Sequence, residues 1–250
     1  MLSSLEFNLN LGYLDDVILG GTVETVASDV AEIIRAGTEI GLSLNVFKCE
    51  LIAHKDFQVD DALLQSFQRV EFEEATLLGA PLFCGAALDT AWDIRCKDLT
   101  RAVDRLKTIS SQDALTLLRS SFSAPRVLHL LRCSPSVDHP SLNKFDDLLR
   151  DSVQQITNSD LSDMKWIQAS LPVRDGGLGI RRVTSLALPA FVASAASTLS
   201  LQADILADCA ALDSNFLHVY LTRLSLAMCR KYCRRNSPSG IVQECWLIRH

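Results

Sequence analysis

The sequence lacks the short motifs that mark the common hydrolases. It contains no Gly-x-Ser-x-Gly elbow and no His-Glu-x-x-His pair, and its five histidines stand apart from one another. It also lacks an excess of positive charge, because 24 Lys and Arg face 30 Asp and Glu, for a net charge of −6. Contacts to a phosphate backbone require Lys and Arg, so this composition argues against a generic nucleic-acid binder.

The eight cysteines, at positions 49, 84, 96, 133, 209, 229, 233 and 245, lack the short regular spacing of a disulfide scaffold. We therefore expect reduced thiols. The first residues show no basic region followed by an apolar core, so no secretory signal is predicted and an intracellular location, cytoplasmic or nuclear, is expected. No membrane partner is expected either. Residues 183–203 carry no charged side chain and are a candidate for a membrane span. Pro189 and six Ser or Thr favour instead a small-residue helix buried among other helices.

Charge is unevenly distributed along the 250 residues. Residues 1–100 carry 6 basic and 17 acidic side chains, residues 101–215 carry 12 of each, and residues 216–250 carry 6 basic and 1 acidic. With 48% hydrophobic residues the chain can bury a substantial core in one or two domains. An acidic first part and a basic tail therefore belong to a folded protein.

Two adjacent carboxylates, Asp15 and Asp16, lie between two strand-like runs. Before them apolar and polar residues alternate from Leu5 to Leu11, and after them Val17-Ile18-Leu19 ends at Gly20-Gly21. The pattern predicts a β-hairpin over residues 5–20 with Asp15 and Asp16 at or beside its tip. Mg²⁺ is commonly held by one or two carboxylates plus substrate phosphates, although Asp-Asp is also an ordinary turn dipeptide.

Four segments in order resemble the reverse transcriptases of retrotransposons without long terminal repeats. They are Tyr13-Leu14-Asp15-Asp16, then Gly41 to Asn45 with Lys48-Cys49-Glu50, then Leu77 to Leu82, and finally Leu171 to Arg181. The first resembles the Tyr-x-Asp-Asp box, the second the next palm motif, the third the hairpin that grips the primer end, and the fourth a segment downstream of the polymerase.

The resemblance implies a site for two-metal nucleotidyl transfer on an RNA or DNA template-primer. Asp15 and Asp16 would bind two Mg²⁺ ions, which lie about 3.5–4 Å apart in such sites. Lys48 would lie close to the nucleotide phosphates and neutralise or protonate the leaving pyrophosphate. Tyr13 would pack on the primer-terminal nucleotide or fill the inner face of the hairpin, and Gly79 would shape the primer-gripping hairpin or serve only as turn chemistry. Without the motif, Lys48 would be an exposed strand lysine opposite Glu50.

The sequence departs from the family at its beginning. The family carries its first catalytic aspartate on a neighbouring strand upstream of the hairpin, whereas twelve residues precede Tyr13 here, and Glu6 lies on the same hairpin strand. We therefore expect no third carboxylate beside Asp15, weak metal binding and no polymerase activity from this chain alone. A palm without its first strands would expose an unpaired sheet edge and favour self-association.

The expected fold is α+β, a partial polymerase palm followed by a mainly helical thumb-like and C-terminal region. Its domains are 1–88 (palm), 89–165 (thumb-like) and 166–250 (C-terminal helices). We expect an amphipathic helix from Thr22 to near Gly41, strands at 46–53 and 75–83, a short helix at 61–67, and almost only helices after residue 88. The helical expectations include a stripe of Ile94, Leu99, Val103 and Leu106, an interruption at Pro125, and helices at 141–157, 187–208 and 213–235.

Two further segments carry alternatives. Residues 174–179, Arg-Asp-Gly-Gly-Leu-Gly, favour a turn over a phosphate cradle because they lack a P-loop or dinucleotide spacing, and Arg181 and Arg182 beyond them either touch nucleic acid or form a solvated pair. In the tail, Arg230, Lys231, Arg234 and Arg235 form a basic patch that binds nucleic acid or faces solvent on a helix. Cys229, Cys233, Cys245 and His250 have the ligand types for zinc without the spacing of a known zinc motif.

Two functions of different class follow. One is a truncated reverse-transcriptase-like polypeptide whose ancestral chemistry was RNA-directed DNA polymerisation. The other is a non-catalytic helical interaction or structural protein that retains a palm fragment.

Overall fold

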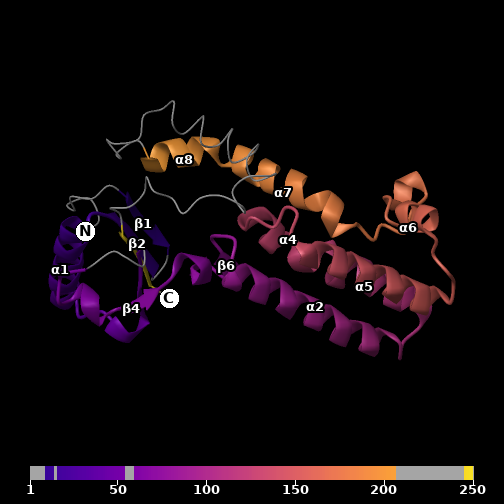
Figure 1. Ribbon diagram of the computed structural model, residues 1–250, viewed down its shortest axis with the longest axis horizontal. Helices are drawn as coiled ribbons and strands as arrows, with labels where there is room; N and C mark the ends of the chain where they lie inside the picture. The colour runs from indigo at the N-terminus through magenta and orange to yellow at the C-terminus, as the bar shows by residue number, and fades with distance from the viewer. Residues whose placement is uncertain (1–8, 14–15, 54–58, 207–244, 250) are drawn as a thin grey trace. The chain divides into compact units, whose positions relative to one another are not determined.

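The computed structural model describes residues 9–13, 16–53, 59–206 and 245–249, and divides the chain into two compact units. Unit 1 comprises residues 1–77 with 198–250, and unit 2 comprises residues 78–197. The fold is α+β and mainly helical, as the sequence predicts (Figure 1).

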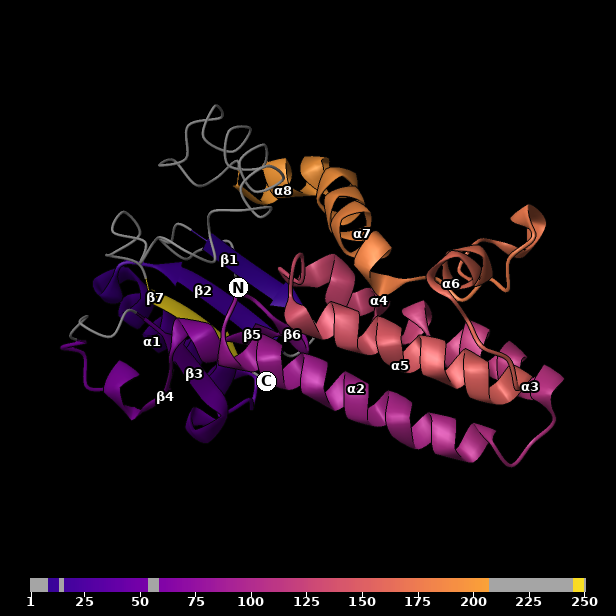
Figure 2. The same ribbon diagram turned by 45° about the vertical axis from the view of Figure 1, so that its right-hand side comes forward.

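Unit 1 is built on a five-stranded sheet of order β1-β2-β7-β3-β4. Its strands are β1 (Leu9–Tyr13), β2 (Asp16–Gly21), β3 (Cys49–Ile52), β4 (Gln68–Val70) and β7 (Cys245–Arg249). β1 and β2 form the expected antiparallel hairpin. β7 pairs antiparallel with both β2 and β3, and β3 pairs parallel with β4. The last strand in the sequence therefore lies in the centre of the sheet (Figure 2).

Helix α1 (Val23–Glu39) follows the hairpin as predicted. Thr22 caps its first turn, where the Thr22 hydroxyl accepts a hydrogen bond from the Thr25 amide at 3.3 Å. Val26 and Val30, one turn apart, are fully buried in the core cluster that also contains Leu19 of β2. After the helix, Gly41 adopts a φ of +79°, a conformation that favours glycine.

Short elements complete unit 1. They are the 3₁₀ turns η2 (Val46–Lys48), η3 (Leu64–Ser66) and η4 (Phe72–Glu74), strand β5 (Thr76–Leu77), and helix α8 (Leu199–Leu206). The expected helix at 61–67 is wrong in type, because only a 3₁₀ turn forms there. It is held by Asp61, whose carboxylate accepts the amides of Leu63 and Leu64, both at 2.9 Å, and such a short side-chain cap suits a turn.

Unit 2 is a helical bundle. Its elements are β6 (Ala80–Pro81), α2 (Ala86–Leu106), α3 (Ser111–Leu117), the π-helix η5 (Leu118–Phe122), α4 (Ala124–Cys133), α5 (Pro140–Thr157), α6 (Asp163–Ala169), the 3₁₀ turn η6 (Val173–Asp175) and α7 (Val183–Ser197). The prediction of helices after residue 88 is confirmed for this unit, and the predicted helix at 141–157 corresponds to α5. The stretch 75–83 forms only the two-residue strands β5 and β6.

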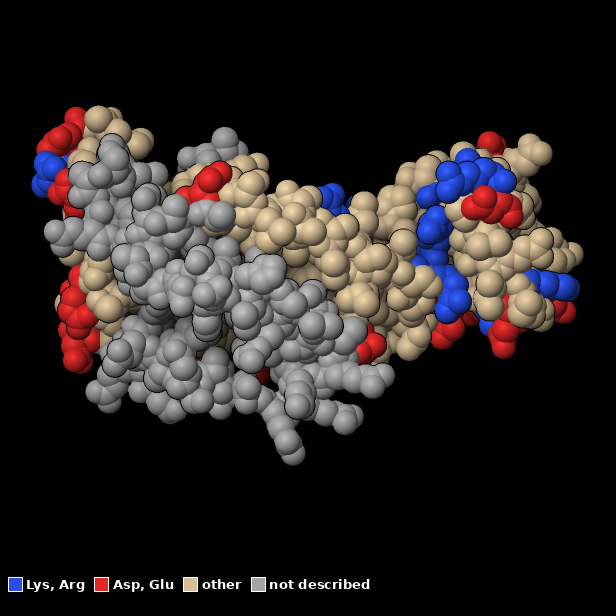
Figure 3. Space-filling model, turned by 90° about the horizontal axis from the view of Figure 1, so that it is seen from above, with Lys and Arg blue, Asp and Glu red and all other residues tan. Residues whose placement is uncertain are grey.

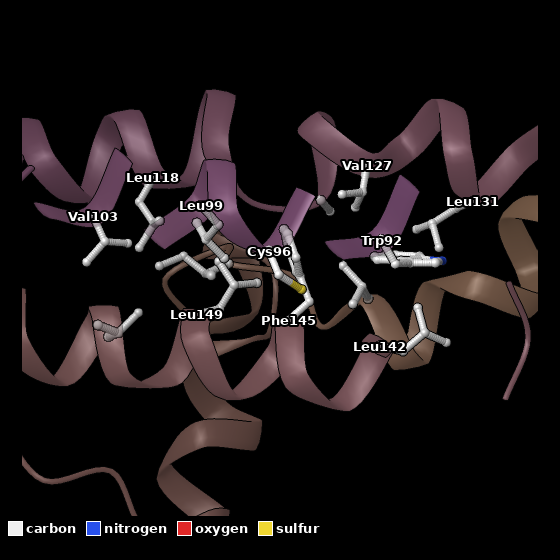
Figure 4. Close-up of a cluster of buried hydrophobic side chains, with 14 of the residues drawn as sticks. Trp92, Cys96, Leu99, Val103, Leu118, Val127, Leu131, Leu142, Phe145 and Leu149 are labelled. Atoms are coloured by element: carbon white, nitrogen blue, oxygen red, sulfur yellow. The ribbon is translucent and has the colours of Figure 1, made fainter. Parts of the chain in front are cut away.

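The core of unit 2 lies mainly between α2 and α5. Trp92, Cys96 and Leu99 of α2 point towards Phe145 and Leu149 of α5 (Figure 4). The rings of Trp92 and Phe145 meet edge to face with centroids 6.1 Å apart, a favourable aromatic geometry. The same cluster continues through Trp166 and Ala187 of later helices. One core therefore includes residues on both sides of position 165.

Several local predictions are corrected. Ile94 is 48% exposed, because the buried face of α2 runs through Leu88, Trp92 and Cys96 instead. Pro125 does not interrupt a helix but stands in the first turn of α4, where its missing N–H is not needed, and the break before it is made by η5. β7 is an exception to the expectation of helices alone after residue 88. The predicted helix at 213–235 lies outside the described residues.

The charge-free segment from Val183 forms α7 and α8, as expected for a helix. It is not buried among other helices, because Val183 and Ala187 are the buried residues of α7. Figure 3 shows this uncharged surface over α7, with Lys and Arg gathered at the end of unit 2 that holds α6. Within the described residues, no helix is both long and apolar enough to cross a membrane.

Candidate functional site

The acidic residue Asp16 of the β1–β2 hairpin is the first residue of β2. The register of the hairpin pairs Tyr13 with Asp16 and Leu9 with Gly20. Asp16 is half-buried, whereas Leu19, Gly20 and Gly21 at the other end of β2 are buried. The part of β2 that lies in the core is therefore the end far from Asp16. Tyr13 is 60% exposed, which is inconsistent with a residue that fills the inner face of the hairpin. Leu14 and Asp15 lie outside the described residues.

The register of β7 aligns the two strands on either side of it. Leu19 of β2 and Leu51 of β3 both pair with Leu247, so they occupy one row across the sheet. Because β7 is antiparallel to both neighbours, β2 and β3 run in the same direction and begin at the same edge. Asp16 and Lys48 each precede the aligned leucine by three residues. Asp16 at the start of β2 and Lys48 just before β3 therefore lie at one edge of the sheet, on either side of β7.

Lys48 itself precedes the strand that was predicted to contain it. It is the last residue of the η2 turn, its amide donates to the Asn45 carbonyl at 3.0 Å, and its side chain is exposed. The next residue, Cys49, begins β3 and is buried. The alternative of an exposed strand lysine opposite Glu50 is therefore confirmed for the exposure of Lys48 and wrong for its place, because Lys48 precedes the strand.

The strand beside β2 brings no carboxylate. β7 reads Cys-Trp-Leu-Ile-Arg, and the nearest acidic strand residue across the sheet is Glu50 on β3, one strand further away. Within the described ranges, no group of three or more His, Cys, Asp or Glu residues is arranged to hold a metal ion. Among the described residues of β2, β7 and β3, Asp16 is therefore the acidic residue at this edge.

Gly79 lies in the turn between β5 and β6. Gly79 has a φ of +75° and Leu78 a φ of +49°, the pair of left-handed residues that a two-residue hairpin turn requires. Nothing lies within 4 Å of a Cβ built on Gly79, so its backbone angle, not space, favours glycine. The carbonyl oxygen of Leu78 is in hydrogen-bond contact with Nε2 of His129, at 3.3 Å. Turn geometry therefore accounts for Gly79 without a bound primer.

The Gly-Gly-Leu-Gly segment closes the end of α6 and is not a phosphate cradle. The amides of Gly177, Leu178 and Gly179 donate to the carbonyls of Pro172, Ala169 and Leu171 at 3.1, 2.9 and 2.9 Å. An anion would need these same N–H groups, but they satisfy the backbone of the chain itself. The turn interpretation of this segment is confirmed by these bonds.

Asp146, which sequence reasoning missed, anchors the residues beyond that turn. It is buried on α5, and its carboxylate accepts the amides of Val183 and Thr184 at 2.7 and 3.2 Å and the Thr184 hydroxyl at 2.6 Å. Burial raises the pKa of Asp146, while these hydrogen bonds and the charge of Arg182 oppose that rise. Arg182 is half-buried beside it, whereas Arg181 is exposed, so the solvated-pair interpretation fits Arg181 and not Arg182. Nothing in the local sequence signals this contact across 37 positions.

The remaining predicted site residues fall in segments that the structure does not describe. These are Arg230, Lys231, Arg234 and Arg235 of the basic patch, and Cys229, Cys233 and His250 of the zinc hypothesis. Of the cysteines whose side chains are described, Cys96 is a buried and Cys133 an exposed free thiol.

Comparison with protein-family models, with curated proteins and with solved structures found no match to this chain. The functional interpretation therefore depends on the residues of the chain and on their placement.

Proposed function

We propose that this chain is a reverse-transcriptase-like polypeptide of the type found in retrotransposons without long terminal repeats. It would comprise part of the palm and the helical region that follows, and its ancestral chemistry would be RNA-directed DNA polymerisation by two-metal nucleotidyl transfer. The observation that carries the proposal is the placement of Asp16 and Lys48. The resemblance assigns both to one active site, and the register brings them to one edge of the sheet.

The order of elements supports the same proposal. A hairpin with the Tyr-x-Asp-Asp residues is followed by α1, by β3, and by the β5–β6 hairpin at Gly79 before the helices begin. At the edge of the sheet, Asp15 and Asp16 would hold Mg²⁺, and Lys48 would neutralise the phosphates of the incoming nucleotide. A template-primer would approach this edge, with the basic tail as a further contact.

We also propose that the chain does not polymerise by itself. Two metal ions must be aligned with the attacking and leaving oxygens, and a carboxylate from the strand beside the hairpin would be required for that alignment. That position is taken by β7, which has no Asp or Glu. The same fact favours the second candidate, a non-catalytic interaction protein that retains a palm fragment.

Primer extension tests the activity. The purified chain is incubated with a primed RNA or DNA template, deoxynucleotides and either Mg²⁺ or Mn²⁺, beside an Asp15→Ala variant. We expect no extension above that of the variant. Extension by the parent chain that Asp15→Ala abolishes would show that the two carboxylates suffice, and the proposed inactivity would be wrong.

A designed carboxylate tests the site itself. Continuing the β2–β7 register by one residue places Ile248 opposite Ile18, on the face of β2 that also carries Asp16. Diagonal neighbours of this kind lie about 7–8 Å apart, within reach of side chains that share ions. Ile248→Asp should therefore strengthen Mn²⁺ binding by about tenfold relative to Ile248→Asn, the equivalent of about 1.4 kcal/mol.

The Asn variant controls for the change of size and polarity, and a second change, Asp16→Asn, should remove the gain. Binding is followed by electron paramagnetic resonance of free Mn²⁺. If Ile248→Asp binds Mn²⁺ no better than Ile248→Asn, the edge does not form a polymerase-like metal site, and the non-catalytic candidate is the better description.

A further inference from the structure

A groove of about 620 Å³ lies in unit 2, away from the residues discussed above. One side is the C-terminal half of α2 and the turn after it, and the other is formed by the end of α3, η5 and the start of α4. The lining residues are Asp98, Leu99, Arg101, Ala102, Arg105, Leu106, Thr108, Ile109, Leu117, Phe122 and Arg126.

The inner surface of the groove is apolar. Leu99, Ala102 and Leu106 are buried at its base, whereas Ile109 and Leu117 are 42% and 40% exposed on its walls. The π-helix η5 shapes one wall, because the Ser123 amide bonds to the Leu118 carbonyl five residues earlier, at 2.9 Å. Such π turns are rare and are often found at functional sites.

The rim of the groove has more guanidinium groups than carboxylates. Asp98 is shared by three arginines, with Nη to Oδ distances of 2.5 Å to Arg101, 3.4 Å to Arg126 and 3.6 Å to Arg95. Partial burial of Asp98 raises its pKa. The hydrogen bonds and charges of Arg101 and Arg126 lower it by more, so the pKa of Asp98 lies below its ordinary value. Asp98 is therefore ionised at neutral pH, and even so the rim keeps a positive excess.

Arg105 adds to this excess. It is exposed one turn after Arg101, and no ion pair to it is found in the part of the chain that the structure describes. The nearest acidic residue in sequence, Asp104, pairs with Lys107 at 2.8 Å instead. The groove thus joins an apolar base to a rim with unbalanced positive charge.

We propose that this groove binds an amphipathic helix of a partner protein, whose apolar face fills the groove and whose Asp and Glu residues pair with the arginine rim. The lining part of α2, from Asp98 to Leu106, spans about 12 Å at 1.5 Å per residue, which matches about two turns of a partner helix. Apolar anchors laid in a groove between helices are a common mode of peptide recognition. A nucleic-acid backbone fits less well, because it would leave Ile109 and Leu117 against phosphates.

Fluorescence anisotropy with the full chain tests the proposal. The probe is a labelled 14-residue helical peptide with leucines along one face and glutamates on both sides of them. Two control peptides replace its glutamates by lysine or its leucines by serine, and a labelled 12-nucleotide single-stranded RNA is measured in parallel. We expect binding of the acidic apolar peptide alone among these peptides, and no RNA binding that depends on the groove.

Paired variants locate the binding. Arg101→Glu with Arg105→Glu should weaken peptide binding by about tenfold or more, since rim charges would now repel the probe. Lys97→Glu with Lys107→Glu makes the same change of charge on α2 and at the residue that follows it, at positions that do not line the groove, and should leave binding nearly unchanged. Ile109→Ser should weaken binding while circular dichroism shows a folded chain, because Ile109 is 42% exposed and is not part of the buried core.

Three results would overturn the proposal. The first is no binding of the acidic apolar peptide. The second is an equal loss of binding in the two double variants, which would indicate attraction by net charge alone. The third is RNA binding that Arg101→Glu with Arg105→Glu removes, which would make the groove a phosphate-binding surface.

Discussion

Replacing Gly177 by alanine should destabilise unit 2 more than any other glycine substitution in the turn after α6. A Cβ built on Gly177 lies 2.1 Å from the Leu171 carbonyl oxygen and 2.6 Å from that of Gln168. Both atoms belong to the backbone, so neither can turn aside as a side chain would. The turn must therefore move as a whole to admit the methyl group.

Movement of the turn would break the hydrogen bonds that close α6. The amides of Leu178 and Gly179 each donate at 2.9 Å, to the carbonyl of Ala169 at the end of that helix and to that of Leu171 just after it. Overpacking costs about 1–3 kcal/mol, and each lost hydrogen bond costs about 1 kcal/mol. We therefore expect Gly177→Ala to lower the free energy of unfolding by about 3–5 kcal/mol, measured by urea denaturation followed by circular dichroism.

Gly176→Ala is the matched control. Gly176 has a φ of +84°, but nothing lies within 4 Å of its built Cβ. The substitution therefore costs only the left-handed backbone, about 1–2 kcal/mol. If the two variants unfold at the same urea concentration, the close approach of Gly177 to the end of α6 does not exist in solution, and the reasoning fails.

Three further predictions concern other parts of the chain. Burial raises the folded-state pKa of Asp146, so its contribution to the free energy of unfolding should be full below the unfolded pKa, near 4, and should be lost as pH rises through the raised pKa. Asp146→Asn should remove that part of the pH dependence of unfolding. It should also weaken the hydrogen bonds that cap α7, at a cost of about 1–3 kcal/mol at neutral pH. Leu247→Pro should separate β2 from β3, because proline removes a ladder bond in a central strand, and size-exclusion chromatography should then show self-association through the opened edges; a monodisperse, folded Leu247→Pro chain would contradict this pairing. Removing the charge of the basic patch (Arg230, Lys231, Arg234 and Arg235) should weaken RNA binding and flatten its salt dependence, and unchanged binding would leave the solvated-face interpretation.

The sequence predicted the elements whose signals are local. The hairpin follows from alternation, and α1 follows from a Thr22 cap and a left-handed Gly41, all within a few residues of the ends concerned. The stripe of α2 was predicted only in part. Its buried residues recur at steps of three and four from Leu88, and Ile94 is out of phase with them. The predicted stripe begins at Ile94 and so leaves out Leu88 and Trp92, which set the phase.

Contacts between distant segments were not predictable in the same way. The row that joins Leu19, Leu247 and Leu51 brings together the two ends of the chain, and no local pattern indicates that Cys245 to Arg249 enter a sheet. The capping of α7 by Asp146 also depends on tertiary packing. The placement of Asp16 and Lys48 at one edge could be expected from the resemblance, but its geometric reason is visible only in the register.

The central position of β7 has a consequence for the order of folding. Unit 2 is one continuous segment, residues 78–197, with a core made by helices that are close in sequence, and such local contacts form quickly. Unit 1 encloses it in the sequence and needs residue 247 to join residue 19. During synthesis the helical bundle can therefore form first, while β2 and β3 wait as open edges until the last strand is released from the ribosome.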